Sequence, residues 1–310
     1  MVAVRSGPWS RALADALCLY VIPVTAALLP WRIGFAWLKL LAHWRFLHRG
    51  SVDSLFAGAA PFFPGVAPDD WKYRARLLLL VEHTDTYLTL LRSDRWWRRH
   101  VAVRGEFPAA DRANLLLTYH WGAGNWIWRV LRTHGIRAHF LARRPHGRSL
   151  GLTRLSLWYG RLRGWSLRRI GCAGVIFTGD SSGAIGSALA QGSSVVGMLD
   201  LGVRGEQQAI AGSLLDRDAR LPFGLVRIAQ RASAPVTFFS VGLDWHSGKR
   251  DIVIHVVPDG TDAAGVMDAY IRHLDQRLRS APQAWQMWHE AHAIFAPQPA
   301  VERSVAPSAS

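Results

Sequence analysis

Residues 115–129 read Leu-Leu-Leu-Thr-Tyr-His-Trp-Gly-Ala-Gly-Asn-Trp-Ile-Trp-Arg. The first five form a mostly apolar run with the length of a buried strand. Gly122 and Gly124 bend easily and let a ligand approach the backbone, so we expect a tight turn after the strand. The large apolar side chains after Asn125 suit a packed helix. The stretch therefore predicts a strand that delivers His120 to a turn before a helix, where α/β folds usually place their chemistry.

Strand-like and helix-like segments alternate along the rest of the chain. Short apolar segments within 139–148, 175–180, 194–200 and 251–257 are typical of strands, whereas 71–91, 154–169, 182–191 and 267–280 are typical of helices. Residues 225–241 read as a helix, a turn and a strand. A chain of 310 residues is long enough to bury a core. We expect an α/β fold over residues 50–295, with a mixed central β-sheet flanked by helices. Residues 296–310 are rich in Pro, Ala and Ser and are expected to be disordered.

The N-terminal segment is the strongest sign of a membrane. Residues 12–42 are mostly apolar, but Asp15, Pro23, Pro30 and Arg32 interrupt them, so they are not an ideal spanning helix of about 20 apolar residues. One kinked span and a hairpin that enters one leaflet are both open, and a buried helix of a soluble protein is the alternative. No cleavage site typical of a secretory signal follows. We expect residues 1–49 to anchor the chain, with flanking bases that keep its body in the cytoplasm.

Composition points to an anionic partner. The formal net charge is +15, hydrophobic residues make up 50% of the chain and there are 15 tryptophans. Codon bias explains an excess of Arg over Lys but not of base over acid, and such a surface attracts anionic lipid, nucleic acid or an acidic carrier protein. Residues 93–101 alternate paired Trp with Arg, a pattern that suits a headgroup layer or single-stranded bases. With an apolar N-terminus in the same chain, we expect a membrane surface and no nucleic acid.

Other common site chemistries find little support. Cys18 and Cys172 are the only cysteines, have no zinc spacing and are expected to be packing residues in a reducing compartment. No glycine-rich nucleotide loop and no metal-binding cluster is apparent, so we expect neither a cofactor nor a metal. Gly179-Asp-Ser-Ser-Gly fits the Gly-x-Ser-x-Gly pattern of hydrolases, which makes Ser181 a rival nucleophile, although the pattern is short and turn-like.

In this context the His120 stretch resembles the signature of the lipid A biosynthesis acyltransferases, within the lysophospholipid acyltransferase superfamily. That signature is His, four residues, then Asp or Glu, and this chain has His120, four residues and Asn125. The resemblance extends in order over roughly residues 10–295. Its further matches are Arg144-Pro145 for a Tyr-Arg-Pro element, Asp200 for the acid of a Pro-Asp element, Ala234-Pro235-Val236, and Pro282, Trp285 and His289 near the end, with Trp288 one place late.

The resemblance implies direct acyl transfer with His120 as general base. Asn125 would orient the imidazole, but an amide cannot supply the negative charge that the family's acid provides. That charge would have to come from Asp200 or Asp180, if either approaches His120. Three outcomes are therefore open: an active enzyme with altered pairing, one tuned to a more nucleophilic acceptor, or a non-catalytic descendant. The turn amides around Gly122 and Gly124 are expected to bind the oxyanion.

Two further regions are expected to bind substrate. Arg143 and Arg144, in a basic loop after a strand, would hold phosphate by fork-like hydrogen bonds, although a solvated loop is the alternative. Asp200 ends a buried strand, and there it would orient an acceptor amine or hydroxyl, position Arg144, or cap the next loop. We therefore place both among the substrate-binding candidates.

The sequence thus predicts an acyltransferase that transfers groups other than amino-acyl groups. Its donor would be acyl carrier protein or acyl-CoA, and its acceptor a lipid or lipid-like molecule, since an acceptor in the bilayer makes anchoring useful. It would lie on the cytoplasmic face of a bacterial inner membrane, against an anionic surface. The competing prediction is a degenerate homologue that binds acyl chains or carrier protein without turnover.

Overall fold

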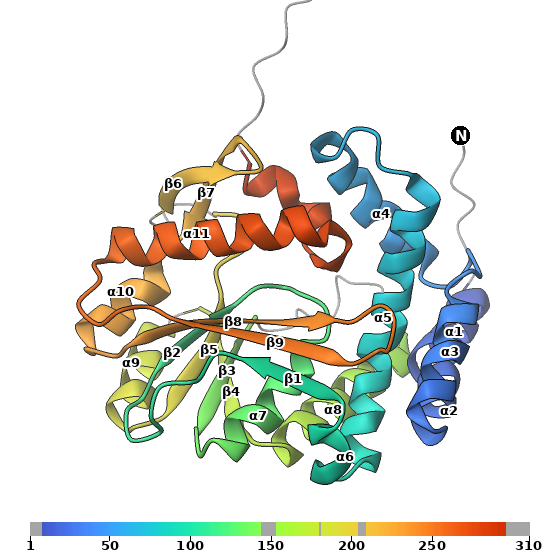
Figure 1. Ribbon diagram of the computed structural model, residues 1–310, viewed down its shortest axis with the longest axis horizontal. Coiled ribbons are helices and arrows are strands. Elements are labelled where there is room, and N and C mark those ends of the chain that lie inside the picture. Colours follow the sequence, from blue (N-terminus) through green and yellow to red (C-terminus); the bar gives the residue numbers. More distant parts are fainter. Residues whose placement is uncertain (1–7, 144–152, 180, 204–208, 296–310) are drawn as a thin grey trace, which may run out of the picture.

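The computed structural model describes residues 8–143, 153–179, 181–203 and 209–295. A seven-stranded sheet in the order β1-β9-β8-β2-β5-β3-β4 lies at the centre (Figure 1). β8, β2, β5, β3 and β4 run parallel, whereas β9 is antiparallel to β8, and β1 is parallel to β9. The strands are β1 (Val101–Arg104), β2 (Leu115–Thr118), β3 (Ala138–Ala142), β4 (Cys172–Phe177), β5 (Ser194–Met198), β8 (Val236–Leu243) and β9 (Arg250–Val256).

The predicted α/β fold with a mixed central sheet is confirmed, and β2 shows why the sequence forms it. Leu115, Leu116 and Leu117 are fully buried. Leu115 and Leu117 belong to the core on one face of the sheet, and Leu116 belongs to the core on the other. A parallel strand covered by helices on both faces is expected to read as such a continuous apolar run.

Helices cover both faces of the sheet. In Figure 1, α11 lies across one face and α7 and α8 across the other, while α5 stands at one end with α1–α3 beside it. A separate two-stranded antiparallel ribbon, β6 (Ala209–Leu214) with β7 (Arg217–Pro222), packs against α11. The helices beyond the N-terminal region are α4 (Arg49–Ala59), α5 (Pro68–Leu91), α6 (Asp94–Arg98), α7 (Ile127–Thr133), α8 (Arg154–Arg169), α9 (Ser182–Ala190), α10 (Gly224–Arg231) and α11 (Ala263–Ser280).

The N-terminal region forms one helix, a break and a second helix. α1 (Pro8–Asp15), a π-helical segment η1 (Ala16–Val21) and α2 (Ile22–Leu28) follow one another directly, and α3 (Trp31–Leu41) starts after Pro30. Among the described residues, one segment, residues 11–28, is long and apolar enough to cross a membrane. These helices also supply buried side chains to the core that contains Leu116, while Leu13, Val21, Leu28, Ile33 and Leu40 stay exposed on their outer side.

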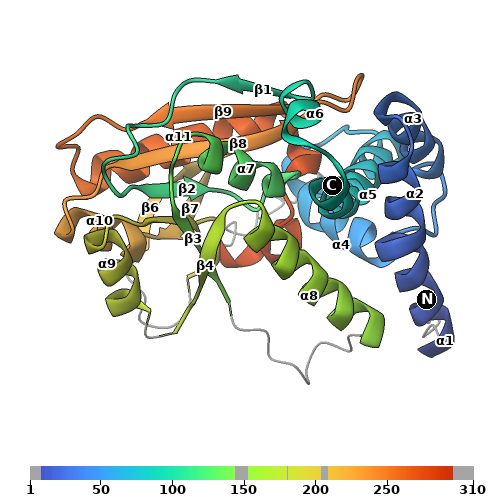
Figure 2. The same ribbon diagram turned by 90° about the horizontal axis from the view of Figure 1, so that it is seen from below.

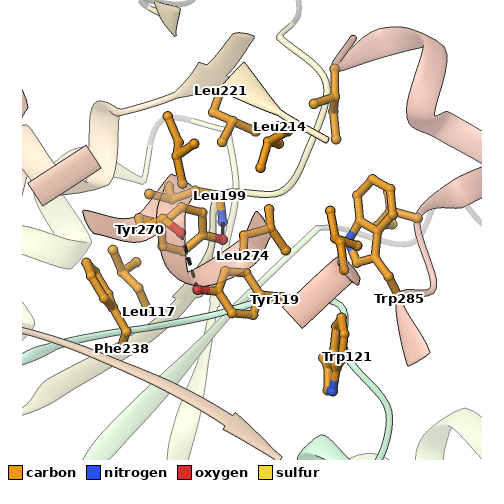
Figure 3. Packing of buried hydrophobic residues seen from close by; sticks show 14 of the residues in the cluster. Leu117, Tyr119, Trp121, Leu199, Leu214, Leu221, Phe238, Tyr270, Leu274 and Trp285 are labelled. Atoms are coloured by element: carbon orange, nitrogen blue, oxygen red, sulfur yellow. Dashed lines mark hydrogen bonds between the residues drawn. The ribbon is translucent and has the colours of Figure 1, made fainter. Parts of the chain in front are cut away.

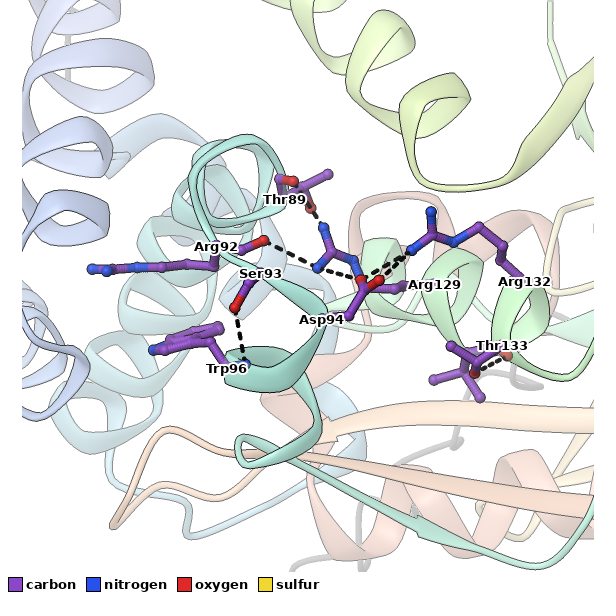
Figure 4. A network of polar contacts seen from close by, with 9 residues as sticks. Thr89, Arg92, Ser93, Asp94, Trp96, Arg129, Arg132 and Thr133 are labelled. Atoms are coloured by element: carbon purple, nitrogen blue, oxygen red, sulfur yellow. Dashed lines mark hydrogen bonds and ion pairs between the residues drawn. The ribbon is translucent and has the colours of Figure 1, made fainter.

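In the Trp- and Arg-rich segment after α5, the prediction of a membrane-facing side chain is wrong for one of the two tryptophans. Trp97 is buried and stacks on Trp126 with ring centroids 4.1 Å apart, so it cannot face a headgroup layer. Asp94 accepts hydrogen bonds from Arg132 of α7 and forms an ion pair with Arg129 (Figure 4). The segment therefore fastens the helix that follows the His120 turn to the end of α5.

Candidate active site

His120 lies directly beyond the carboxyl end of β2, and the neighbouring parallel strand β5 ends two residues before Asp200. Because parallel neighbours end at the same edge of the sheet, the two side chains meet. Nδ1 of His120 donates to Oδ1 of Asp200 at 2.9 Å, and the backbone N–H of His120 donates to Oδ2 at 2.7 Å. The acid that pairs with His120 therefore comes from the next strand.

Asp200 is buried completely behind the histidine, whose side chain is 27% exposed. Its Oδ2 accepts a third hydrogen bond, from the indole N–H of the buried Trp285 at 2.7 Å. Three donors thus hold the carboxylate in one orientation, as a buried charge requires. The pair presents the imidazole outward and keeps the carboxylate away from solvent.

Tyr270 of α11 ties the two strand ends together. Its hydroxyl donates to the carbonyl of Thr118 at 2.9 Å and accepts from the N–H of Leu199 at 3.1 Å. Figure 3 shows Tyr270 between Tyr119 and Leu199, with Trp285 approaching from the C-terminal segment. The hydroxyl thus bridges Thr118, two residues before His120, and Leu199, the residue before Asp200, and so holds the two strand ends together.

The C-terminal segment completes this frame. The N–H of Gln286 donates to the carbonyl of His120 at 2.8 Å, and the N–H of Gly122 donates to the carbonyl of Ala284 at 3.1 Å. Trp121 and Trp285 pair here as an isolated antiparallel bridge. Residues 284–286, within the Trp-containing segment noted in the sequence, therefore hold the His120 turn.

Charge and burial act in opposite directions on His120. Burial lowers the pKa of its imidazole, but the Asp200 charge and hydrogen bond raise it by more, with smaller help from Glu290 and Glu82. The net pKa lies above the usual 6.5. Because Nδ1–H donates to Asp200, Nε2 is the nitrogen that takes up a proton, as in a histidine oriented by a carboxylate.

Asn125 does not orient His120, so that expectation is wrong. The side chain is buried in the short 3₁₀ turn η3 (Gly124–Trp126), and its Oδ1 accepts from Arg163 at 3.4 Å. Its Nδ2 has no hydrogen-bond partner among the described residues. His120 is paired with Asp200 instead. The buried Asp200 is therefore a positioning residue and not the expected substrate contact.

Two charged residues near Asn125 escaped the sequence analysis. Glu82 of α5 is buried and forms an ion pair with Arg163 of α8 at 2.6 Å, and its other oxygen accepts from the Gln286 side chain. Burial lowers the pKa of Arg163, but the Glu82 charge outweighs it, so the pKa is raised and the guanidinium stays protonated. The sequence did contain a sign of Glu82, because this carboxylate directly follows the apolar run Leu-Leu-Leu-Leu-Val at residues 77–81.

A cavity of about 950 Å³ joins these groups. Its wall includes His120, Glu82, Asn125 and Arg163, together with many apolar side chains. Of the predicted substrate-binding residues, Gly122, Gly124 and Arg143 line it, whereas Arg144 and Asp180 lie outside the described residues.

The turn amides do not serve as predicted. The N–H groups of Trp121, Gly122 and Gly124 already donate to backbone carbonyls, at 2.7, 3.1 and 2.9 Å. They are therefore not free to hold an oxyanion. Gly122 has a φ of +36°, and a Cβ there would come within 3.2 Å of Leu78, so its role is to let the turn pass over α5.

Ser181 lines the same cavity but belongs to another part of it. β4, which precedes it, is three strands away from β2, or about 14 Å at the usual spacing. That separation does not suit a nucleophile activated by His120. The described residues include no group of three or more His, Cys, Asp or Glu side chains arranged to hold a metal ion.

Comparison of the chain with protein-family models gave no match, and comparison with curated proteins gave none either.

Proposed function

We propose that this chain is an acyltransferase that moves an acyl chain from a thioester to a hydroxyl or amine of a lipid or lipid-like acceptor. The observation that carries the proposal is the His120–Asp200 pair at the wall of a large cavity. A histidine backed by a buried carboxylate is suited to take a proton from a hydroxyl or amine. The resemblance of the His120 stretch to lipid A acyltransferases agrees with this chemistry.

The cavity beside His120 is suited to an acyl chain. Most of its lining surface is apolar. Ligand pockets of about 300–1,000 Å³ with apolar walls and a few convergent polar groups are typical of small-molecule sites. The apolar lining residues include Ile127, Trp128, Phe140, Leu141, Leu167, Ile185, Val196, Leu225, Ile228 and Phe239.

In the proposed reaction, the side chains of the protein act directly on the two substrates. Nε2 of His120 takes the proton of the acceptor hydroxyl or amine while the acceptor oxygen or nitrogen bonds to the thioester carbon. The resulting oxyanion collapses and the carbon–sulfur bond breaks. The leaving thiolate then receives the proton from the imidazolium, which Asp200 stabilises while it is charged.

Arg163 is our candidate cation for the oxyanion, since it is held in place by Glu82, although Arg143 also lines the cavity. Arg163 lines the same cavity, and its pairing with Glu82 uses one Nη atom, at 2.6 Å. A fixed guanidinium in a partly dry site stabilises developing negative charge more than it would in water. Arg163 would thus take the role that we first assigned to the turn amides.

The same proposal places the protein at the cytoplasmic face of a bacterial inner membrane. Residues 11–28 meet the length and composition of a spanning helix, which is modest support. The net charge of +15 suits anionic lipid and an acidic donor such as acyl carrier protein, with acyl-CoA as the other candidate donor.

The experiment compares membranes that contain the wild type, His120→Ala, Asp200→Asn or no protein, by mass spectrometry of the total lipid extract. We expect one acylated species to disappear in both variants while the variant proteins accumulate to the wild-type level. Unchanged lipid profiles in all four samples, together with tight binding of a fluorescent fatty acid, would favour the non-catalytic binding protein instead.

A further inference from the structure

The exposed face of α8 has an unusual composition. Residues 154–169 contain no Asp or Glu. The exposed side chains of the helix are three large apolar ones, Leu157 (46%), Trp158 (63%) and Trp165 (49%), and those of Arg154, Arg161, Arg168 and Arg169. Apolar, aromatic and cationic groups thus share one solvent-facing side, which a solvated helix does not need.

Contacts on this face pair each tryptophan with a cation. The guanidinium of Arg161 lies 5.2 Å from the ring centroid of Trp158, and that of Arg169 lies 5.6 Å from the ring of Trp165. Indole rings and basic side chains together are the residues that prefer the headgroup layer of a bilayer. The absence of carboxylates makes the face complementary to anionic lipid.

α8 is fastened to the apolar N-terminal helix. The hydroxyl of Tyr20 donates to the carbonyl of Leu155 at 2.8 Å, and Ser156 donates to Asp15 at 2.5 Å. Figure 2 shows the first turn of α8 beside α1 at the same end of the molecule. The exposed side chains of Leu13 and Val21 extend the apolar surface along that helix. A bilayer that receives residues 11–28 would therefore meet α8 as well.

The inner side of the same helix faces the cavity. Arg163 and Leu167 of α8 line the cavity that His120 also lines. The helix thus separates the cavity from the Trp- and Arg-rich surface by its own thickness, about 10 Å. A lipid held at that surface would need to move only around α8 to reach His120.

We propose that the exposed face of α8 lies in the headgroup layer of an anionic bilayer and guides the lipid acceptor into the cavity. This inference deepens the proposed function by naming where the acceptor enters, and it rests on that function for the acceptor alone. The contact with the bilayer is independent of turnover. An acidic carrier protein is the competing occupant, but it would not account for the attachment of α8 to the apolar helix.

The test places an environment-sensitive NBD label on single cysteines of the full chain, reconstituted in vesicles. Cys18 and Cys172, which are both buried, are first replaced by Ala so that each variant carries a single cysteine. Labels are then attached after Trp158→Cys, Trp165→Cys or, as the matched control, Arg272→Cys. Arg272 is exposed on α11, which packs on the opposite face of the sheet from α8.

In vesicles of phosphatidylcholine and phosphatidylglycerol, we expect the emission at positions 158 and 165 to shift to shorter wavelength and to be quenched by spin-labelled lipid. The label at position 272 should change little. The shift should shrink in pure phosphatidylcholine and in Arg161→Gln/Arg169→Gln, because the attraction to anionic lipid is electrostatic. Equal spectra at positions 158 and 272 would overturn the proposal.

A second measurement separates the competing occupant. If acyl carrier protein changes the emission at position 158 and anionic vesicles do not, the face binds protein and the bilayer proposal is wrong. If the wild-type protein shows no acyltransferase activity but the spectral shift is present, the proposed function is contradicted and the membrane contact is not. The two failures are therefore distinguishable.

Discussion

Asp200 and Asn125 are two candidate partners for His120, and the structure treats them differently. Asn125 is five residues from His120 in the chain, yet its side chain reaches Arg163. Asp200 is 80 residues away, yet it holds both the imidazole and the backbone N–H of His120. Neighbouring parallel strands bring distant residues to the same edge more reliably than a short spacing brings near ones, because the direction of a side chain depends on the turn that carries it.

The two surroundings also differ in how fully they are hydrogen-bonded. Each oxygen of Asp200 accepts a short hydrogen bond, and Oδ2 accepts two. Asn125 makes one long contact, and among the described residues its Nδ2 has no partner. A fully paired buried carboxylate holds one geometry, whereas a partly paired amide does not. The Asp200 side is therefore the fixed part of the site.

Asp200→Asn should reduce kcat the most. It keeps the shape but removes the charge that stabilises the imidazolium, and it permits the wrong tautomer of His120. In the serine protease triad the equivalent change costs about 10⁴ in turnover, and we expect a loss of about 10³–10⁴ in kcat here. The rate at which the lipid product forms measures this loss, and thermal unfolding of the variant is the control for folding. A loss of less than tenfold would show that His120 works without Asp200.

The pH profile should report the same pairing. The pKa of His120 is raised, and the base must be neutral, so kcat/KM should fall as pH drops through a value above 6.5. Below that inflection the loss is about tenfold per pH unit. In Asp200→Asn the remaining activity should show the inflection at lower pH, because burial then acts without the opposing charge. An inflection that does not move would place the titrating group elsewhere.

Trp285→Phe should have a smaller effect. It removes the indole N–H that Asp200 accepts and keeps most of the buried ring. A hydrogen bond to a charged group is worth about 1.5–3 kcal/mol, so we expect the free energy of unfolding to fall by about that amount. The loss of kcat should stay below that of Asp200→Asn. Trp288→Phe, which removes a bond to the carbonyl of Pro282, is the matched control and should leave kcat unchanged.

Asn125→Asp should change activity least. It restores the acid of the family signature, but that position faces Arg163 and not His120. We expect kcat to fall by about tenfold at most, because the new carboxylate pairs with Arg163 and weakens the charge offered to the oxyanion, but leaves the His120–Asp200 pair intact. Combined with Asp200→Asn it should not rescue turnover. A rescue would mean that Asn125 can reach His120 after all.

Much of this site was readable from the sequence, and what was missed has a common cause. The apolar run before His120, its glycine turn and the strand that ends near Asp200 were all predicted, because strand patterns and turn residues are local. Glu82 and Arg163 were missed because they lie 81 positions apart in the sequence, and α5 and α8 meet only in the folded chain. The role of Asn125 was wrong because spacing alone does not set the direction of a side chain.

Trp285 has a consequence for how the protein is made. It lies 85 residues after Asp200, so a ribosome that has released His120 and Asp200 must add the whole of β8, β9 and α11 before the indole N–H reaches the carboxylate. Residues 11–28 leave the ribosome long before that point. Under the proposed function, a nascent chain would meet lipid before Trp285 holds Asp200. Translation that stops before Trp285 would then yield a chain that reaches the membrane without a complete site.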